Sequence, residues 1–554
     1  MIDYILEIKG LRLDLSSTSQ SILKGIDLKL RRGKLTGIVG ESGSGKTMTA
    51  LSIMGLLSKD FNTVKGEILF HKESSSGISL LNKDVIKKVR GREIAMIFQE
   101  PMTSLNPAMT CGAQINEFIK AHLPDKKNER KKKTLQYLEK VKLPDPKKAY
   151  SSYPHQLSGG QLQRVMIAMA LSVNPCLLIA DEPTTALDVT VQKEILLLLK
   201  ELQKEFKLSI MFITHDLRIL NEIADDIIVM KEGNVIEKGS RDQIFSNSKM
   251  PYTQGLIACQ PSLDKRPARL LTIEDFEKGI TNTKNEETPI KRKYPELLLN
   301  IINLNLFYKS SDIIGKNKGF QALKNLDLKV FHGETLGLVG ESGCGKTSLG
   351  KTILGLIKAQ SGDIIYKSKN LSDLKNKEFR KFRKNIQVVF QDPYSSLNPR
   401  IKIKTILLEA RKLHFRKEKH SESLKIIQNL MIDTGLEISD LEKFPHEFSG
   451  GQRQRIGIAR ALAPEPEFLV LDEAVSALDV SIQAQILNLL NDLKKQYNLS
   501  YIFISHDLSV VKYMSDRIII MRNGEIEEEG DPEKIYLNPE SQYTRILIDS
   551  IPGK

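Results

Sequence analysis

The sequence predicts an α/β fold that occurs twice in tandem along one chain. Residues 40–47 (GESGSGKT) recur almost unchanged at residues 340–347 (GESGCGKT). Residues 98–101 (FQEP) recur as FQDP from position 390, and the later matching segments lie 291 positions apart, as in 472 − 181 = 291. A period of that length is a whole domain, far longer than a solenoid repeat of about 20–50 residues. The 554 residues also exceed the roughly 250–300 at which a single hydrophobic core stops growing.

The order of elements within each half is typical of a parallel sheet preceded by shorter strands. The first half opens with residues 6–13 and 23–30, in which apolar and polar residues alternate as in half-buried strands. An apolar strand then leads into the glycine-rich segment and a helix over residues 47–57. Other short apolar runs indicate strands buried on both faces. Such strands are expected at residues 35–39, 176–180 and 210–214.

Two polar stretches mark the other parts of the chain. Residues 101–153 are polar and helical in pattern, which suggests a helical lobe inserted into the first domain. Residues 261–297 are polar and interrupted by proline and glycine, as expected of a linker. We therefore predict a first domain over residues 1–260, this linker, and a second domain over residues 298–554.

Composition narrows the class of protein. With 40% hydrophobic and 27% charged residues, the chain has the make-up of a globular protein. No apolar run approaches the roughly 18–20 residues that cross a bilayer, and residues 1–7 lack the pattern of a secretory signal. The four cysteines stand far apart, without the spacing of a zinc site or a disulfide framework. A reducing cytoplasm is the expected location.

The charge balance leaves two interpretations open. The formal net charge is +14, which permits a nucleic acid, a ribosome or an anionic membrane surface as partner. A lysine-biased composition with charges spread over solvated faces explains the same number. Charge alone therefore does not identify a partner.

The two glycine-rich segments predict phosphate-binding loops. Both fit the pattern G-x-x-x-x-G-K-[ST], in which backbone amides approach phosphate oxygens and the following helix adds its positive end. We expect Lys46 to bridge the β- and γ-phosphates and Thr47 to ligate Mg²⁺. The predicted phosphate-binding residues are Gly40, Glu41, Ser42, Gly43, Ser44, Gly45, Lys46 and Thr47, and Gly340, Glu341, Ser342, Gly343, Cys344, Gly345, Lys346 and Thr347.

Two carboxylates end an apolar strand in each half: Asp181 and Glu182 in the first, Asp472 and Glu473 in the second. The first carboxylate of each pair suits Mg²⁺, and the second can orient and deprotonate an attacking water. Taken alone, the pair is equally well explained as the acidic start of a helix. Its matching spacing from a phosphate loop in both halves favours the metal and general-base roles.

A glutamine and a histidine also follow apolar strands in each half. The amides of Gln99 and Gln391 are predicted to reach Mg²⁺ or water. His215 and His506 precede an aspartate at the end of another strand, where an imidazole can donate to a γ-phosphate and distinguish ATP from ADP. Each is unremarkable by itself and gains meaning from its place in the series.

A third glycine-rich motif, LSGGQ at residues 157–161 and FSGGQ at residues 448–452, decides between nucleotide-binding families. It has the character of a helix start that grips an anion. Its predicted functional residues are Ser158, Gly159, Gly160, Gln161, Ser449, Gly450, Gly451 and Gln452. With this motif the chain resembles the ATP-binding cassette family over nearly its full length. The landmarks occur in family order twice, including Ala-Leu-Asp at residues 186–188 and 477–479.

The resemblance implies two tandem cassettes, each a P-loop NTPase core with an N-terminal antiparallel β subdomain and a helical subdomain. In that family two cassettes pack head to tail. The LSGGQ-type motif of one cassette, called its signature, closes over the ATP held by the other. The resemblance therefore implies an intramolecular cassette dimer with two hydrolytic sites, ATP and Mg²⁺ as cofactors, and Asp188 and Asp479 as the D-loop aspartates. Family members stack adenine on an aromatic side chain, which Tyr308 supplies; the aligned residue of the first half is Leu15.

More specific segments resemble the dipeptide, oligopeptide and nickel importer ATPases, closest to the fused type of the oligopeptide and microcin C importers. These segments are residues 98–107 and 390–399, 153–156 and 444–447, and 251–256 and 542–547. The resemblance implies a peripheral subunit on the cytoplasmic face of a bacterial inner membrane. It would power import through two permease subunits fed by a solute-binding protein, with the helical lobes receiving the permeases. Some relatives carry a cysteine cluster that this sequence lacks, so no iron–sulfur centre is expected.

Two alternatives stay open from the sequence. A tandem-cassette protein acting on ribosomes or nucleic acid is compatible with the positive charge, but such proteins join their halves by a long charged helix, and the linker here contains Pro267, Gly279, Pro289 and Pro295. We therefore expect no nucleic-acid partner. A sugar importer ATPase is a nearer competitor, which the peptide-importer segments oppose. Peptide is the favoured solute, with peptide antibiotic, nickel and glutathione also possible.

Overall fold

The computed structural model forms two compact units of similar construction. It describes residues 3–16, 20–72, 77–185, 187–263, 266–281, 296–308, 319–374, 376–476 and 478–551. Unit 1 comprises Met1–Ile257 and Phe276–Gly279, and unit 2 comprises Ala258–Asp275 and Ile280–Pro552. The predicted α/β fold in two tandem domains is confirmed.

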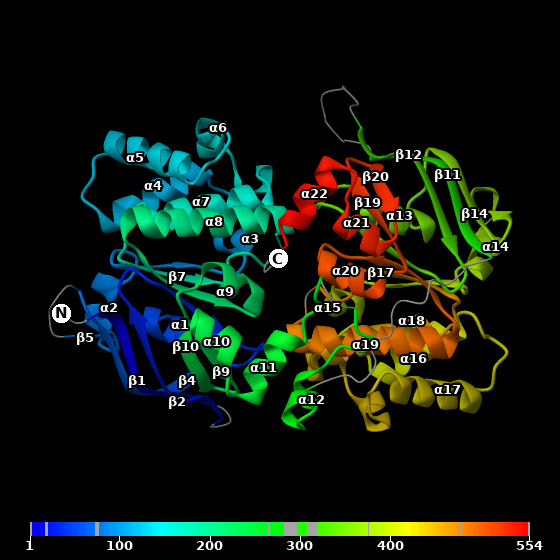
Figure 1. The fold of residues 1–554 in the computed structure, drawn as a ribbon, viewed down its shortest axis with the longest axis horizontal. Coiled ribbons are helices and arrows are strands. Elements are labelled where there is room, and N and C mark those ends of the chain that lie inside the picture. The colour runs from blue at the N-terminus through cyan, green and yellow to red at the C-terminus, as the bar shows by residue number, and fades with distance from the viewer. Residues whose placement is uncertain are drawn as a thin grey trace. The chain divides into compact units, whose positions relative to one another are not determined.

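Unit 1 contains two sheets (Figure 1). The antiparallel sheet has the order β2-β1-β4-β5, with β1 (Tyr4–Leu15), β2 (Ser21–Arg31), β4 (Phe61–Phe70) and β5 (Ile78–Ser79). The larger sheet has the order β10-β9-β3-β8-β7-β6, with β3 (Leu35–Val39), β6 (Ile94–Ile97), β7 (Leu177–Asp181), β8 (Ser209–Thr214), β9 (Asp226–Lys231) and β10 (Asn234–Ser240). All its strands are parallel except β10 at the edge.

The helices of unit 1 divide between the sheets and a helical lobe. Those outside the lobe are α1 (Lys46–Met54), α2 (Lys83–Val89), α7 (Gly159–Leu171), α8 (Val189–Phe206), α9 (Leu217–Ile223), α10 (Arg241–Asn247) and α11 (Pro251–Ala258). The predicted lobe over residues 101–153 is helical, with α3 (Pro101–Ser104), α4 (Cys111–His122), α5 (Lys127–Lys140) and α6 (Pro146–Ser151), followed by the short helix η1 (Pro154–Gln156). Another short helix, α12 (Ile273–Glu277), follows α11 in the chain.

Unit 2 repeats both sheets with the same orders. The antiparallel sheet is β12-β11-β14-β15, with β11 (Leu297–Tyr308), β12 (Phe320–Phe331), β14 (Ser361–Tyr366) and β15 (Lys369–Asn370). The larger sheet is β16-β17-β18-β13-β19-β20, with β13 (Thr335–Val339), β16 (Ile386–Val389), β17 (Phe468–Asp472), β18 (Ser500–Ile504), β19 (Arg517–Arg522) and β20 (Glu525–Gly530).

The helices of unit 2 follow the same plan. They are α13 (Lys346–Ile353), α14 (Asn376–Phe382), α15 (Pro393–Ser396), α16 (Ile403–Lys412), α17 (His420–Asp433), α18 (Gly450–Leu462), α19 (Val480–Tyr497), α20 (Leu508–Met514), α21 (Pro532–Leu537) and α22 (Gln542–Asp549), with the short helices η2 (Leu371–Asp373), η3 (Ile438–Glu442) and η4 (Pro445–Glu447).

The parallel strands form where the sequence places apolar runs, because a strand covered by helices on both faces exposes no side chain to water. Every residue of β3 is buried, and so is every residue of β8. The predicted strand over residues 35–39 is confirmed without change. The predicted helix over residues 47–57 is wrong at its end: α1 stops at Met54 because Gly55 takes a left-handed conformation (φ 61°) that caps the helix.

The predicted linker meets the structure in part. Residues 282–295 lie outside the described residues, so the linker boundaries stay a prediction. Earlier in the predicted linker some residues are packed: Leu270, Thr272 and Ile273 are buried, and Ala258–Asp275 groups with unit 2 although it follows unit 1 in the chain. A polar composition therefore did not mean an unpacked segment.

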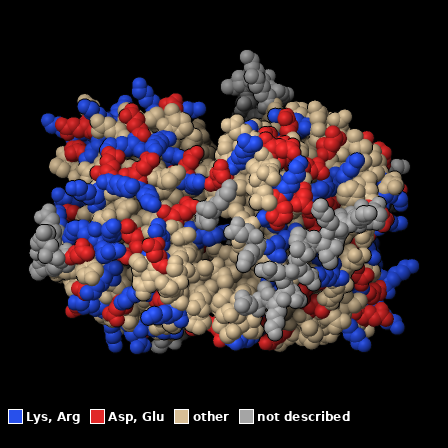
Figure 2. Space-filling model, in the orientation of Figure 1, with Lys and Arg blue, Asp and Glu red and all other residues tan. Residues whose placement is uncertain are grey.

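Charged side chains of both signs are interspersed on the face shown in Figure 2. That face fits the interpretation in which the net charge of +14 arises from a lysine-rich, solvated surface. No helix among the described residues is both long enough and apolar enough to cross a bilayer.

Glycines allow the helix that follows each LSGGQ-type motif to pack against its neighbour. A Cβ on Gly160, at the start of α7, would lie 2.5 Å from Val191 Cγ1 on α8. A Cβ on Gly451 of α18 would likewise lie 2.5 Å from Ile482 Cγ2 on α19. The preceding Gly159 has its nearest contact at 3.5 Å, an ordinary van der Waals distance.

This packing predicts different effects for the two glycines. Gly160→Ala should destabilise unit 1 by about 1–3 kcal/mol through overpacking, which calorimetry would register as a lower unfolding temperature. Gly159→Ala, with the same change in helix propensity, is the matched control and should leave that temperature nearly unchanged. Adding Val191→Ala to Gly160→Ala should restore stability. Equal transitions for the two single variants would contradict the packing argument.

Candidate functional site

The first glycine-rich segment forms a loop between β3 and α1. Gly45 caps α1 in a left-handed conformation (φ 100°), and a Cβ there would lie 2.6 Å from Leu23 Cδ2, so only glycine fits without strain. The Lys46 ammonium group donates hydrogen bonds to the carbonyl oxygens of Gly40 (2.7 Å) and Glu41 (2.9 Å). Lys46 is buried, and these hydrogen bonds hold its ammonium group inside the loop. A phosphate-binding loop needs a positive charge at this place.

The loop is joined to the end of β7 by one side-chain hydrogen bond. Thr47 Oγ1 donates to Asp181 Oδ1 at 3.2 Å. Asp181 is 2% exposed, and burial raises its pKa to about 6, while the Thr47 hydrogen bond acts in the opposite direction. A hydroxyl and a carboxylate held together at a phosphate loop are the oxygen donors that Mg²⁺ prefers.

Glu182 is the point where three other side chains meet. Its carboxylate accepts from Gln99 Nε2 (3.2 Å) and Thr185 Oγ1 (2.9 Å) and lies 3.2 Å from His215 Nδ1. Burial opposes its ionisation, but the hydrogen bond and charge of His215 bring the pKa of Glu182 below its usual value. An ionised, half-enclosed carboxylate of this kind can accept a proton from water.

The backbone of Glu182 is itself unusual. Its φ is +45°, in a region that costs a non-glycine residue roughly 1 kcal/mol or more. The strained turn lets Glu182 N donate to Ile213 O in β8 (3.0 Å) and turns the glutamate out of line with β7. Glu473 has the same conformation, with φ +48°.

Unit 2 reproduces this geometry around its own loop. Lys346 Nζ donates to Gly340 O (2.6 Å) and Glu341 O (2.9 Å), and Thr347 Oγ1 donates to Asp472 Oδ1 (3.2 Å). Burial again raises the pKa of Asp472. The structure thus assembles two equivalent centres, each from segments more than a hundred residues apart.

The general-base candidate of unit 2 also has matching partners. Gln391 Nε2 donates to Glu473 Oε2 at 2.7 Å, and His506 Nδ1 lies 3.5 Å from the same oxygen. Burial acts to raise the pKa of Glu473, but the hydrogen bond from His506 and its charge lower it overall. Gln391 and His506 therefore both contact the carboxylate of Glu473 in this structure.

The LSGGQ-type motifs form the starts of α7 and α18. Ser158 N donates to Gln161 Oε1 (3.1 Å), and Gln161 N donates back to Ser158 Oγ (3.4 Å). Ser449 and Gln452 make the same reciprocal pair at 3.0 and 3.3 Å. This capping box fixes the start of each helix. Pairing of each motif with the opposite phosphate loop stays a prediction.

The D-loop candidates lie where each signature helix meets the next helix along the chain. Asp188 directly precedes α8, and Asp479 directly precedes α19. The alanines of both Ala-Leu-Asp segments, at positions 186 and 477, lie outside the described residues. The role of these aspartates stays a prediction.

Two tyrosines at the phosphate loops were not singled out individually from the sequence. Glu41 N donates to the Tyr252 hydroxyl at 3.3 Å, and Glu341 N donates to the Tyr543 hydroxyl at 3.2 Å. Both tyrosines are buried. They belong to the Tyr-Thr segments at 251–256 and 542–547, whose recurrence in the two halves was the available signal. Each segment therefore contacts its phosphate loop through one tyrosine hydroxyl.

The predicted adenine contact differs between the halves. The Tyr308 hydroxyl lies 3.1 Å from Ser348 Oγ on the phosphate-loop helix α13, and Tyr308 is 40% exposed. In unit 1 the corresponding Leu15 pairs with Phe61 across the antiparallel sheet. An exposed aromatic ring beside the phosphate-loop helix fits a stacking role, which stays a prediction.

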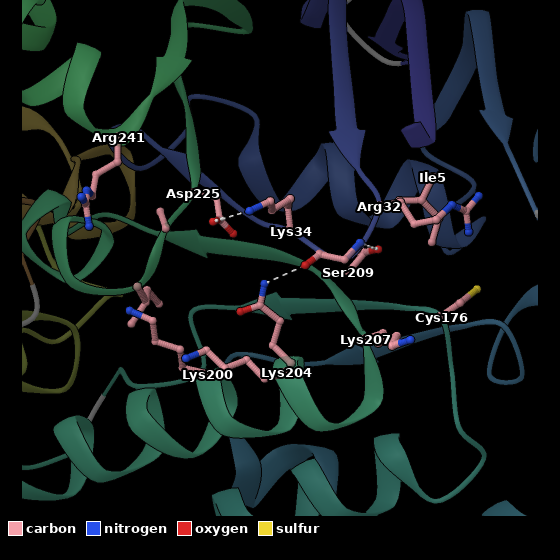
Figure 3. Close-up of a pocket in the computed structure, with 14 residues that line it drawn as sticks. Ile5, Arg32, Lys34, Cys176, Lys200, Lys204, Lys207, Ser209, Asp225 and Arg241 are labelled. Atoms are coloured by element: carbon pink, nitrogen blue, oxygen red, sulfur yellow. Dashed lines mark hydrogen bonds and ion pairs between the residues drawn. The ribbon is translucent and has the colours of Figure 1, made fainter. Parts of the chain in front are cut away.

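A separate cavity of about 590 Å³ lies at the amino-terminal ends of strands in the large sheet of unit 1, away from the phosphate loop (Figure 3). Lys34, Ser209 and Asp225 line it at the points where strands begin, whereas the phosphate loop follows a strand end. Lys34 points toward Asp225, and its Nζ forms an ion pair with Asp225 Oδ1 at 3.2 Å. The cavity is rich in basic side chains: Arg32, Lys34, Lys200, Lys204, Lys207 and Arg241. It contains none of the predicted site residues.

Comparison with known proteins agrees with this geometry. The family model described as ABC transporter matches residues 23–185 and 323–476. The model for the oligopeptide/dipeptide transporter C-terminal region matches residues 236–285. Within the described residues, no group of three or more His, Cys, Asp or Glu side chains forms a metal site.

Relatives match along nearly the whole chain. The glutathione import ATP-binding protein GsiA of Salmonella paratyphi A is 41% identical over 558 residues, covering 99% of this chain and 89% of that protein. GsiA of Escherichia coli K12 is 41% identical over 563 residues with the same coverage. A solved dimeric cassette, MJ0796 bound to ADP and Pi, covers 42% of this chain and 99% of its own at 28% identity and a TM-score of 0.39. The chain therefore belongs to the ABC transporter family of ATPases, with two ATP-binding cassettes in one polypeptide.

Proposed function

We propose that the protein is the ATP-hydrolysing subunit of a bacterial ABC importer for peptides or peptide-like solutes. The observation that carries this proposal is the pair of complete centres, each with a phosphate loop, a Thr–Asp pair and a glutamate held by glutamine and histidine. The match to the oligopeptide/dipeptide transporter C-terminal region supports the importer class.

Each centre can perform hydrolysis with its own residues. Lys46 and the loop amides bind the phosphates, and Glu182 orients a water and accepts its proton. His215 holds the glutamate and can donate to the γ-phosphate. Thr47 and Asp181 would hold a Mg²⁺ ion, whose positive charge would offset the negative charge of the phosphate oxygens. Thr347, Asp472, Glu473 and His506 would act in the same way in the second centre.

We further propose that the two cassettes share their sites head to tail. Ser449 and Gly451 would close over the ATP held by residues 40–47, and Ser158 and Gly160 over the ATP held by residues 340–347. ATP then stabilises the closed arrangement and its hydrolysis removes that stabilisation. A ligand shifts a conformational equilibrium only by such a difference in affinity.

The transport partners follow from the family. Two membrane permease subunits would receive the helical lobes on the cytoplasmic face of the membrane, and a solute-binding protein would deliver the solute. The matched relatives are named for the import of glutathione, so glutathione and oligopeptides are the first solutes to test. A sugar, nickel or ribosome-directed role finds less support, because the C-terminal match is to peptide transporters.

The general-base assignment predicts the effect of neutral substitutions. Glu182→Gln and Glu473→Gln should each remove about half or more of the ATP turnover, because one of two bases is lost. The double variant should fall by about 100-fold or more. Phosphate release measures turnover, and binding of a fluorescent ATP analogue provides the control, since glutamine keeps the shape of the site. Unchanged turnover in either single variant would refute two hydrolytic sites.

The tyrosine contacts predict a change in nucleotide affinity. Tyr252→Phe and Tyr543→Phe each remove one hydrogen bond to a loop amide, which should weaken ATP binding about two- to tenfold. Tyr501→Phe is a matched control, because its buried hydroxyl bonds Leu490 O in the core of unit 2 and touches no phosphate loop. Titration of nucleotide fluorescence measures the affinity. An equal loss in the control variant would show a general effect of stability instead.

The importer class predicts the partners in a purified complex. Expressed in its own cell and captured from detergent-solubilised membranes, the protein should bring permease subunits with it. Glutathione or an oligopeptide, presented with the binding protein, should raise its ATP turnover in proteoliposomes. Recovery with ribosomes in an RNase-sensitive form would instead support the ribosome-directed alternative.

A further inference from the structure

The segment Ala258–Asp275 follows the first cassette in the chain but packs as part of unit 2. It lies within the match to the oligopeptide/dipeptide transporter C-terminal region. Its apolar side chains Cys259, Leu270 and Ile273 are buried. We call this segment the strap. The strap makes hydrogen bonds with residues of α19 and α20 in the second cassette.

Asn488 on α19 holds the centre of the strap. Leu270 N donates to Asn488 Oδ1 (3.0 Å), and Asn488 Nδ2 donates back to Leu270 O (2.9 Å). Asn488 is 3% exposed and Leu270 is 2% exposed. One amide side chain thus satisfies both backbone groups of a buried residue, and losing either bond would leave a buried polar group unpaired.

Contacts on both sides of Leu270 extend this attachment. Lys512 on α20 donates to Leu263 O (2.5 Å). Arg266 donates to the carbonyl oxygen of Tyr513 (3.0 Å), and Arg269 pairs with Asp492 on the surface (3.0 Å). The described residues of the strap are therefore attached at Leu263, Arg266 and Arg269 as well as at Leu270.

The first cassette has no counterpart to the central contact. The position equivalent to Asn488 is 488 − 291 = 197, and Leu197 has a hydrocarbon side chain that is 53% exposed. A leucine cannot hydrogen-bond a passing backbone. Among the described residues, the side chain that holds Leu270 is therefore present in the second cassette and replaced by leucine in the first.

The strap also reaches the signature helix of unit 2. Arg455, on α18 shortly after Ser449, donates to Thr434 O (2.8 Å) and to Gln485 Oε1 on α19 (3.2 Å). Gln485 Nε2 in turn donates to Glu274 Oε1 of the strap (3.4 Å). Burial lowers the pKa of Arg455, and the charge of Glu274 acts in the opposite direction.

The same arginine in the first cassette has a carboxylate of its own. Arg164 on α7 donates to Val141 O (2.8 Å) and pairs directly with Glu194 on α8 (2.7 Å). Glu194 and Gln485 are equivalent positions, since 485 − 194 = 291. Where the first cassette uses a charged residue on its own helix, the second has a neutral amide with a glutamate of the strap behind it.

We propose that the strap is a working part of the second cassette and that Glu274 is a positioning residue for its signature helix. Through Gln485, Glu274 provides Arg455 with the negative charge that Glu194 gives to Arg164. Arg455 then ties α18 to α17 and α19 and fixes the direction in which Ser449 and Gly451 point. The effect on ATP rests on the proposed head-to-tail arrangement, in which this signature serves the ATP of the first phosphate loop.

The attachment is tested by limited trypsin digestion of the full-length protein, with cleavage at the Arg269–Leu270 bond followed by mass spectrometry. Asn488→Ala should raise the rate of cleavage at this bond about tenfold, because local opening no longer breaks two buried hydrogen bonds. Leu197→Ala, at the equivalent position of the first cassette, should leave the rate unchanged. An unchanged rate in Asn488→Ala would overturn the docked strap.

The charge role is tested by exchange of the carboxylate between the strap and α19. Glu274→Gln should raise the KM for ATP about two- to fivefold with a smaller change in kcat, the size expected for the charge of a solvent-exposed carboxylate. Gln485→Glu, which copies Glu194 of the first cassette, should restore the KM in the Glu274→Gln background. Asp492→Asn removes a surface carboxylate that pairs with Arg269 of the strap and should leave the KM unchanged.

Thermal unfolding separates this proposal from the proposed function. Glu274→Gln should lower the melting temperature of unit 2, and Gln485→Glu should restore it, whether or not the protein hydrolyses ATP. Restoration of stability together with an unaltered KM would overturn the link to the signature and leave ATP hydrolysis standing. Failure of Gln485→Glu to restore either quantity would show that Glu274 does not act through its charge.

Discussion

The hydrogen bond between the phosphate-loop threonine and the aspartate that ends the strand two positions away in the sheet is the constraint on which both centres depend. It exists only because β3, β8 and β7 run parallel and bring their carboxyl ends to one edge. The loop follows β3, the Asp-Glu pair ends β7, and the histidine follows β8. Register along β8 also places the strained glutamate, whose amide bonds Ile213 O. Any shift of these strands by one residue would turn the acidic side chains to other directions.

The sequence was informative where chemistry and local pattern coincide. The strand over residues 35–39, the phosphate loops and the signature helix starts could all be located, because each is defined by neighbours in the chain. Their meeting in space could be anticipated from parallel-strand topology. The partners of Glu182 were harder to foresee, since Gln99 and His215 had been expected at a metal or a phosphate and here contact the glutamate. The choice among several nearby acceptors depends on how the folded chain places each side chain.

Composition misled where packing is set at long range. The strap reads as a polar linker, because its proline, lysine and arginine residues resemble those of an unpacked segment. Its order comes from Asn488, more than two hundred residues away, and from buried backbone groups that have no signature in a local window. Tyr252 and Tyr543 show the same limit. Their recurrence was visible, but their bond to a loop amide depends on how α11 and α22 return to the loops.

The two halves have equivalent reaction centres, but the residues that surround these centres differ. This difference limits how far one cassette could replace the other. Unit 1 carries Leu15 and an internal Arg164–Glu194 pair, whereas unit 2 carries Tyr308 and an arginine backed by a glutamate of the strap. A second cassette taken without residues 258–275 would keep every catalytic side chain yet expose Asn488 and leave Arg455 without that carboxylate. Fusion therefore does more than keep two cassettes at equal concentration, because the chain after the first cassette completes the second.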